Sequence, residues 1–562
     1  MGIKRAYFVV LAVALGCTNS HYRKSADKAA YSQIEEKRPL VANADPEFTI
    51  EQTNVVSLTN LPIVITAEEA FGAEAELERG AHIISLEKAL EIAVYHSRIY
   101  QSQKEQLFLQ SLQLSLVRNQ YTPIFTGRGR ADYQVITAQG TRIIVDPITQ
   151  EPKVELSDDL VEQHRIAVGG ALGANWFLKT GAALSVAFTS DFLRYLTGDP
   201  RPFASSQLAA TLVQPLWRGA GYKIATENLT QAERNLLYAL RDYTRFRRDF
   251  SVQIATAYYS VLQNKDAVRN AWRGIQNFKL NVDREKALAQ EGLKTQASLG
   301  LLQQSELNTE TSWISALRNY RQSLDQFKIQ LGLSTDAHVV LDDRELEELK
   351  ILHPEITSDE AQESALAMRL DLYNVRDQFV DAGRRVHVVA NGLRPQVDIV
   401  SSVALNSDPQ GDGASLPQWG RYRWNAGLNV DLPFERTAQR NNYRAAIINQ
   451  EQAGRQLQQR EDEIKLQVRN DWRNLEQARR NFASSEIGVE LSERRVQEQE
   501  LRAQVGRGTA RDLVDAQNDL IAQKNLRTQA LVAHTIARLQ FWNDMGILYI
   551  KDNGRWEEGA GK

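Results

Sequence analysis

The fold is decided by one stretch, Gly506-Arg507-Gly508-Thr509-Ala510-Arg511-Asp512-Leu513-Val514-Asp515-Ala516-Gln517, because its pattern occurs twice in the chain. Five residues of this region recur at a constant shift of 214 positions, and a proline-containing pentapeptide upstream recurs at a shift of 218. An ordered series of this kind indicates two tandem structural units. The matching residues are Gly292, Thr295, Leu299, Gln303 and Gly332 with Gly506, Thr509, Leu513, Gln517 and Gly546; Gln214-Pro215-Leu216-Trp217-Arg218 with Leu432-Pro433-Phe434-Glu435-Arg436; and Pro123 with Pro395.

Each unit is predicted to run helix, strands, very long helix, glycine turn, helix. The first helix is expected over residues 86–119 in unit one and 358–392 in unit two, because both segments end shortly before a proline. Alternating apolar residues after each proline, such as Leu428 and Val430, predict half-buried strands. With clustered aromatic residues, the strands fit either a transmembrane barrel or a soluble β-sandwich. An insertion in unit one adds either a strand pair or a long loop, so four or six strands per chain are both open.

The segment from about Ala438 to Ala503 predicts a helix of unusual length, since it contains no proline and only two glycines. At 1.5 Å per residue it would extend roughly 100 Å. Its apolar stripe is narrow and repeats at intervals of three, four and seven residues, which is typical of a coiled-coil seam. The stripe consists of Ile464, Val468, Trp472, Leu475, Phe482 and Val489.

The N-terminus has the pattern of an export signal. Lys4 and Arg5 precede an apolar stretch over residues 6–16, which is too short to span a bilayer. Ala14-Leu15-Gly16-Cys17 then resembles the lipobox of bacterial lipoproteins, and Cys17 is the only cysteine. The resemblance implies that residues 1–16 are a lipoprotein signal peptide and that Cys17 is acylated, for example with palmitate. The alternative is an ordinary signal peptide with an incidental cysteine. After Ile83 no hydrophobic run reaches the length of a membrane helix, so a membrane crossing of the body would require a β-barrel.

These features together resemble the TolC-like outer-membrane efflux protein family, over about Leu86 to Leu548. The resemblance implies a fold that is mainly α with a membrane β-barrel part, in which tandem helix–strand–long-helix-hairpin units form a trimeric α-barrel and β-barrel tunnel. Oligomerisation is required on physical grounds too, because four or six strands cannot close a water-filled barrel. The expected domains are an N-terminal extension (17–83), repeat 1 (84–333), an equatorial linker (334–357), repeat 2 (358–548) and a C-terminal tail (549–562).

The same resemblance implies the partners and the location. The homotrimer would sit in the bacterial outer membrane, contact outer-membrane lipid and extend into the periplasm. Its hairpin tips would meet a periplasmic adaptor (membrane fusion) protein, and an inner-membrane pump would be reached indirectly. The chain is thus expected to be a passive channel subunit of a tripartite efflux or type I secretion system. The alternative is a lipid-anchored periplasmic coiled-coil scaffold or adaptor without a pore.

Asp512 and Asp515 are the candidates for a pore constriction. They are three residues apart on one helical face, and threefold symmetry would set six carboxylates around the narrow end of the tunnel, favouring cations. The family resemblance places aperture aspartates at these two positions. The alternative is helix capping, because Thr509 with Asp512 resembles a capping box. Both interpretations are open for Asp512, whereas Asp515 lies past the first turn and favours the pore.

The two hairpin tips are the candidate adaptor contacts. Their glycines are first of all a structural requirement of a helical hairpin, and the side chains beside them are the contact candidates. The best-known family member has an arginine at the position of Gly508 and an aromatic residue at that of Ala503, both in a closing latch. Arg507 could substitute from one position away, with different geometry. The tip residues are Gly292, Leu293, Lys294, Thr295, Gly506, Arg507, Gly508 and Thr509.

Composition and motifs argue against other function classes. A formal charge of −3 without a basic cluster argues against a nucleic-acid partner. The eight histidines lack metal-ligand spacing, and no glycine-rich phosphate loop follows a strand. No thiol would remain after acylation. We therefore expect no enzyme activity, no metal and no cofactor.

Overall fold

The computed structural model describes residues 18–51, 57–59, 61–66, 68–145, 151–196, 202–408, 416–505 and 507–557. Cys17 and Gly506 lie outside these ranges. The chain divides into two compact units. The helical unit consists of Met1–Ser111, Leu236–Gln378 and Gly454–Lys562, and the sheet unit of Leu112–Asn235 and Phe379–Ala453.

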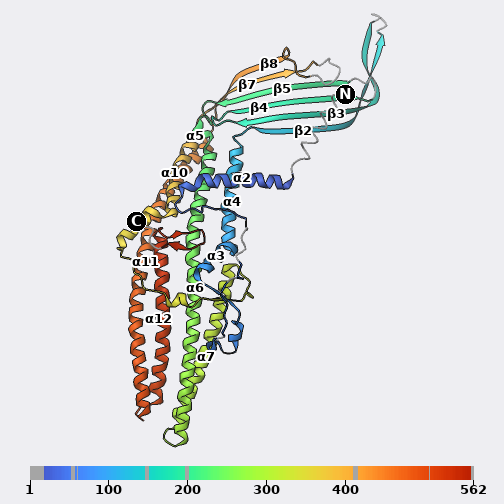
Figure 1. Ribbon diagram of the computed structural model, residues 1–562. Helices are drawn as coiled ribbons and strands as arrows, with labels where there is room; N and C mark the ends of the chain where they lie inside the picture. The colour runs from blue at the N-terminus through green and yellow to red at the C-terminus, as the bar shows by residue number, and fades with distance from the viewer. Residues whose placement is uncertain are drawn as a thin grey trace. The chain divides into compact units, whose positions relative to one another are not determined.

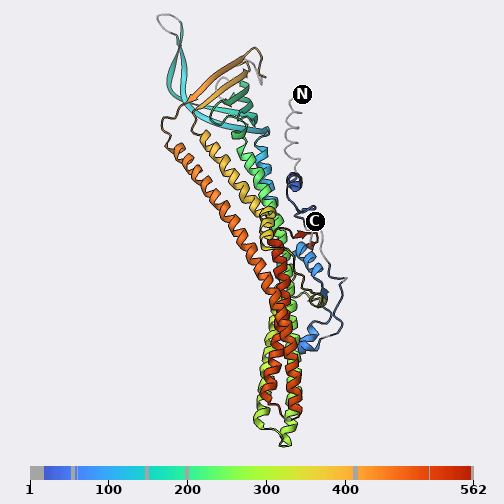
Figure 2. The same cartoon turned by 90° about the vertical axis from the view of Figure 1, so that its left-hand side faces the viewer.

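Two helical hairpins form most of the helical unit (Figures 1 and 2). In the first, α6 (Glu227–Gln290) turns into α7 (Gln296–Leu331); in the second, α11 (Thr437–Gln504) turns into α12 (Ala510–Asp544). The 68 residues of α11 confirm the predicted long helix to within one residue at each end. The other helices are α2 (Asn19–Lys37), α3 (Leu86–His96), α4 (Arg98–Asn119), α5 (Tyr222–Ala225), α8 (Arg344–Glu347), α9 (Ser358–Met368) and α10 (Leu370–Asn391), with 3-10 helices η1 (Arg38–Leu40) and η2 (Glu69–Leu77).

The first helix of each repeat is broken, and our expectation of continuous helices over 86–119 and 358–392 is wrong. In repeat 1 the break lies at Ser97, between α3 of 11 residues and α4 of 22 residues. In repeat 2 it lies at Arg369, between α9 of 11 residues and α10 of 22 residues. Both break residues have extended backbone, with ψ of 125° and 121°. The two repeats therefore share even this irregularity.

A glycine from the end of each hairpin packs against each break. Gly332, which ends α7 with a φ of 81°, lies so close to the first break that a Cβ there would be 2.0 Å from the carbonyl oxygen of His96. Gly546 follows α12 with a φ of 80°, and a Cβ there would be 3.1 Å from the carbonyl oxygen of Met368. Only glycine combines a positive φ with so close a backbone approach. The paired glycines and breaks explain why these residues recur in the sequence.

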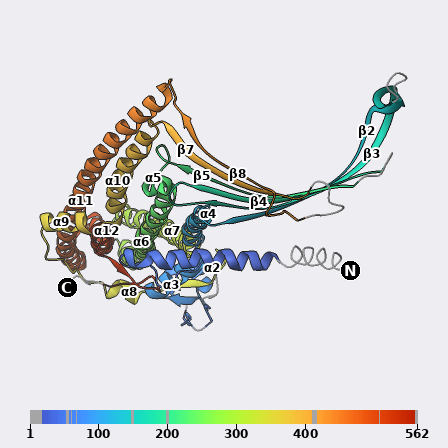
Figure 3. The same ribbon diagram turned by 90° about the horizontal axis from the view of Figure 1, so that it is seen from above.

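Six antiparallel strands form the sheet unit, in the order β2-β3-β4-β5-β7-β8 (Figure 3). The insertion in repeat 1 is therefore a strand pair, so repeat 1 supplies four strands and repeat 2 supplies two. The strands are β2 (Ile124–Val145), β3 (Pro152–Phe177), β4 (Ala183–Tyr195), β5 (Pro202–Pro215), β7 (Gln396–Asn406) and β8 (Tyr422–Asp431). In the helical unit, β1 (His82–Ile84) pairs in parallel with β6 (Val339–Leu341), and β9 (Tyr549–Ile550) pairs with β10 (Trp556–Glu557).

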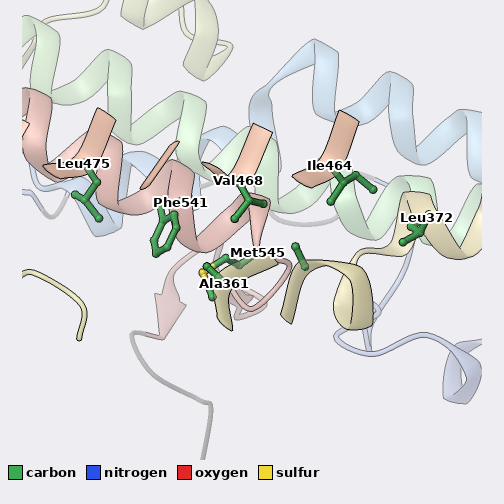
Figure 4. Packing of buried hydrophobic residues seen from close by; sticks show 8 residues of the cluster. Ala361, Leu372, Ile464, Val468, Leu475, Phe541 and Met545 are labelled. Atoms are coloured by element: carbon green, nitrogen blue, oxygen red, sulfur yellow. The ribbon is translucent and has the colours of Figure 1, made fainter. Parts of the chain in front are cut away.

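The predicted seam of α11 forms the core of the second repeat. Ile464, Val468 and Leu475 are fully buried against residues of α9, α10 and α12, among them Phe541 (Figure 4). Farther along, Phe482 is only half-buried, and Ser485 is buried instead. Toward the hairpin tip, the buried positions of α11 are thus Ser485 and Ser492, followed by Val496. Within the described residues, no helix is long and apolar enough to cross a membrane.

We expect a buried histidine of α12 to make the stability of the helical unit depend on pH. His534 is 0% exposed, and both of its ring nitrogens lack a hydrogen-bond partner among the described residues. Burial, with the charges of Arg538 on the same helix, His353 on the linker and Arg479 on α11, lowers the pKa of His534 to about 4. The nearby carboxylate of Glu476 accepts hydrogen bonds from Arg479.

Because the folded-state pKa lies below the ordinary value near 6.5, the unfolded chain binds this proton first as the pH falls. The associated stability is complete above pH 6.5 and is lost between pH 6.5 and about 4. We expect a loss of about 3 kcal/mol over this window. Thermal unfolding followed by circular dichroism at pH 7 and pH 4.5 measures it. His534→Leu should flatten this pH dependence, whereas His21→Leu, on an exposed helix end, should leave it unchanged; equal slopes in both variants would contradict the assignment.

Candidate aperture and hairpin tips

Each hairpin tip begins its returning helix with the same cap. Thr295 accepts a hydrogen bond from the backbone N–H of Ser298 at 3.2 Å, and Thr509 accepts one from the N–H of Asp512 at 3.1 Å. Threonine is a favoured residue at this position because its hydroxyl satisfies a backbone donor that has no partner within the helix. Gly292 has a φ of 76°, as a tight turn between two helices requires. The structural role expected for the glycine of the first tip is thus confirmed.

Asp512 and Asp515 are both exposed on the first turns of α12. The carboxylate of Asp512 accepts a hydrogen bond from the Thr509 hydroxyl at 2.6 Å, so this residue takes part in the cap. Asp515 forms no hydrogen bond or ion pair with any residue that the structure describes. Its neighbours Val514 and Ala516 are buried. A carboxylate that is exposed and has no described partner can face an aqueous lumen, whereas capping accounts only for Asp512.

The two tips are tied together by a contact that sequence reasoning missed. The ammonium of Lys294, in the first tip, donates to the carbonyl oxygen of Gly508, in the second tip, at 3.3 Å. These two residues are 214 positions apart and are therefore equivalent in the two repeats. The shift of 214 positions could have indicated this contact, because two repeats whose tips lie side by side bring equivalent positions together. Lys294 is half-buried in this contact, whereas Leu293 is 70% exposed.

Gly508 is held so tightly that it has no room for a latch side chain. Its N–H and that of Arg507 both donate to the carbonyl oxygen of Arg502, at 3.0 and 2.9 Å. A Cβ on Gly508 would lie 2.8 Å from the backbone nitrogen of Ala503. A longer residue would force the backbone apart at this point. Arg507 beside it is exposed, and the tip contact is made by Lys294 rather than by an arginine. Gly506 lies outside the described residues.

The described part of the chain shows no cluster of three or more His, Cys, Asp or Glu side chains that could hold a metal ion. The exposed side chains at the tips are the carboxylates of Asp512 and Asp515 on α12, together with Leu293 and Arg507. Such an arrangement can attract or repel ions and can contact another protein.

Comparisons with known proteins place the fold. No family model and no curated protein matches the sequence. Among solved structures, the Campylobacter jejuni CmeC outer-membrane channel is similar over 91% of this chain and 96% of its own, at 11% identity and a TM-score of 0.59. The Neisseria gonorrhoeae MtrE outer-membrane channel, in its open state, is similar over 90% and 99%, at 13% identity and a TM-score of 0.55. CusC, a protein that forms a transmembrane channel, is similar over 82% and 92%, at 12% identity and a TM-score of 0.59. The chain therefore has the fold of the outer-membrane channel proteins, in agreement with the TolC-like resemblance of its sequence.

Proposed function

We propose that this chain is one of three identical subunits of a passive exit duct in the bacterial outer membrane, serving a tripartite efflux or type I secretion system. The observation that carries the proposal is the combination of a six-stranded sheet with two long helical hairpins. The sheet has two edge strands, β2 and β8. Strand edges are not tolerated in lipid, so each edge needs a partner strand from another copy.

Three copies supply enough strands for a pore. With six strands from each chain, closing β8 of one copy on β2 of the next gives an 18-stranded barrel. Barrels of 16–18 strands enclose an aqueous channel, whereas about eight strands only enclose their own side chains. Every residue of β8 is exposed in the single chain, as expected of a strand that is covered only in an assembly.

The remaining roles follow from this arrangement. Cys17 is the proposed lipid anchor, the tip residues are the proposed contacts of a periplasmic adaptor, and Asp512 and Asp515 are the proposed constriction. Transport is passive in this subunit, which needs no catalysis, cofactor or nucleic acid. The adaptor alternative is disfavoured by architecture, because an adaptor usually has one helical hairpin between split β halves, whereas this chain has two hairpins in tandem repeats.

Single-channel conductance of the purified protein in a planar bilayer tests the proposal. We expect discrete steps from a trimeric preparation. A protein that remains folded and trimeric but gives no steps under any condition, including with its tips opened, would favour a scaffold role instead.

Removing the tie between the tips is expected to open the resting duct more often. Lys294→Met deletes one hydrogen bond from a charged donor, worth about 1 kcal/mol net, which shifts the open-to-closed ratio roughly fivefold for each copy. Open probability in single-channel records measures the shift. Lys279→Met removes the same charge from an exposed position on the same hairpin and is the matched control. Unchanged gating in Lys294→Met would mean that this contact does not hold the tips.

A further inference from the structure

The strand pair β2–β3 continues well beyond the rest of the sheet, as all three views show (Figures 1 to 3). β2 and β3 pair from Ile124 with Asn175 to Val145 with Pro152, with one register shift between Gln139 and Thr141. β3 pairs with β4, however, only from Arg165 onward. We call the part beyond this level the ribbon; it consists of residues 135–145 of β2 and 152–164 of β3. At about 3.4 Å per residue, the eleven ribbon residues of β2 extend roughly 35 Å past the sheet.

The ribbon is not expected to be stable as an isolated strand pair in water. An isolated two-stranded pair is marginally stable, and an edge strand without protective charges tends to pair with other strands. The β2 side of the ribbon has one charged residue, Arg142, and neither proline nor an acidic residue. Seven of its eleven residues are valine, isoleucine or threonine, which favour strands. Two of its described aliphatic side chains are exposed, Val135 to 48% and Val145 to 62%.

The β3 side of the ribbon has the complementary character. It carries four acidic residues and one lysine, a formal charge of −3 with histidine neutral, against +1 on the β2 side. It also exposes aliphatic side chains, with Leu160 69% and Val161 48% exposed. The β2 side of one ribbon and the β3 side of another therefore match in charge and in apolar character. Strand direction matches too, because β2 and β3 run antiparallel.

We propose that the three ribbons of the trimeric duct pair with one another, β2 of one copy against β3 of the next, and narrow its outer mouth. The inference rests on the proposed function. In that function the lower part of β2, within the sheet, already pairs with β8 of another copy. Within the sheet unit, the helices α4, α5, α10 and α11 join the strands at the end away from the ribbon tip, so the ribbon is at the opposite end of the sheet from these helices. Three ribbons supply six strands, fewer than the eight or so that fill their own interior with side chains.

Distances between copies test the pairing. Because the proposed acylation of Cys17 leaves no free thiol, a single spin label at Val145→Cys reports on the ribbon tip, and one at Leu196→Cys reports on its base, where the N–H of Leu196 donates to the carbonyl oxygen of His164 at 2.8 Å. Double electron–electron resonance spectroscopy measures the distance between equivalent labels on different copies of the trimer. We expect this distance to be shorter for the Val145 labels at the ribbon tip than for the Leu196 labels at its base. Longer distances between tip labels would show that the ribbons stand apart, which overturns the proposal.

Two variants test the narrowing. Val135 and His164 face each other across the strands, so an Asn-Gly turn between them replaces residues 136–163 without touching the pairing of β3 with β4. Ile144→Lys keeps the ribbon but puts a second charge on the β2 edge. Both should raise single-channel conductance above that of the unmodified trimer, and Ile144→Lys should also lengthen the Val145 distance. Unchanged conductance in both variants would refute the narrowing while leaving the duct itself intact; absence of any conductance in the unmodified trimer would refute the duct.

Discussion

Replacing Asp512 and Asp515 with asparagine is expected to lower the cation-over-anion permeability ratio of the duct by about one order of magnitude. Each of the six carboxylates around one constriction contributes roughly 0.2 kcal/mol to the energy of a passing ion once water and salt screen its charge, and the sum of about 1.2 kcal/mol approaches a tenfold change. Asparagine has nearly the same shape and can still take part in the cap with Thr509, whose hydroxyl now donates to Asp512 at 2.6 Å. The effect on the ratio is therefore electrostatic and not a result of local unfolding.

Reversal potentials in asymmetric salt measure the ratio directly. Asp519→Asn is the matched control, because Asp519 lies on the same helix and is already paired with Arg495 at 2.5 Å. It should leave the ratio unchanged. The single variants separate the two roles, since Asp515→Asn should carry more of the effect if Asp512 acts mainly in capping. If the double variant keeps the selectivity of the unmodified duct, both aspartates belong to the helix end and the constriction lies elsewhere.

Gly332→Ala is expected to destabilise the helical unit by roughly 2–5 kcal/mol, the largest effect that we expect from any single methyl group in this chain. A left-handed backbone costs alanine about 1–2 kcal/mol, and forcing a methyl group into packed backbone adds a further 1–3 kcal/mol. At Gly332 the obstacle is the carbonyl of His96, 2.0 Å from the Cβ position, and a backbone carbonyl cannot rotate away as a side chain can.

Gly292→Ala separates the two contributions. Gly292 has a similar φ, 76° against 81°, but no heavy atom lies within 4 Å of its Cβ position. We therefore expect a loss of only about 1–2 kcal/mol at this site. Chemical unfolding followed by circular dichroism compares the two variants. A similar loss of stability in both would mean that the break at Ser97 moves easily to accept the methyl group, contrary to the packing seen here.

The long elements were predictable because their signals are local. The absence of proline between Ala438 and Ala503 sufficed to place α11, and the alternation around Leu428 placed β8. The breaks at Ser97 and Arg369 were not predictable, because neither is a proline or a glycine. Each break lies against a glycine more than 170 positions away in sequence, and the two meet only in the folded chain. The strand pair in the insertion was likewise undecided, since a loop of that composition was equally compatible with the sequence.

The features of the hairpin tips also fall into two groups, those that the sequence predicts and those that only the structure shows. The caps of Thr295 and Thr509 follow from residues three positions apart, so the sequence could indicate them. The contact of Lys294 with Gly508 joins two tips and needed the structure. The pore role of Asp515 stays a prediction, because a lumen exists only between copies and one chain does not contain it.

The order of strands in the sheet has a consequence for how the chain folds. Four of its five strand pairs join neighbours along the chain, but β5 pairs with β7 across about 200 residues, as between Gln207 and Asn406, which are 199 positions apart. The strands β2 to β5 can pair with one another as soon as repeat 1 has been synthesised. The free edge of β5, in contrast, gains its partner β7 only when the last third of the chain is present. Closing a loop of this length is entropically costly and slow. Until β7 is available, this unpaired β5 edge is where a mistaken strand pairing would begin.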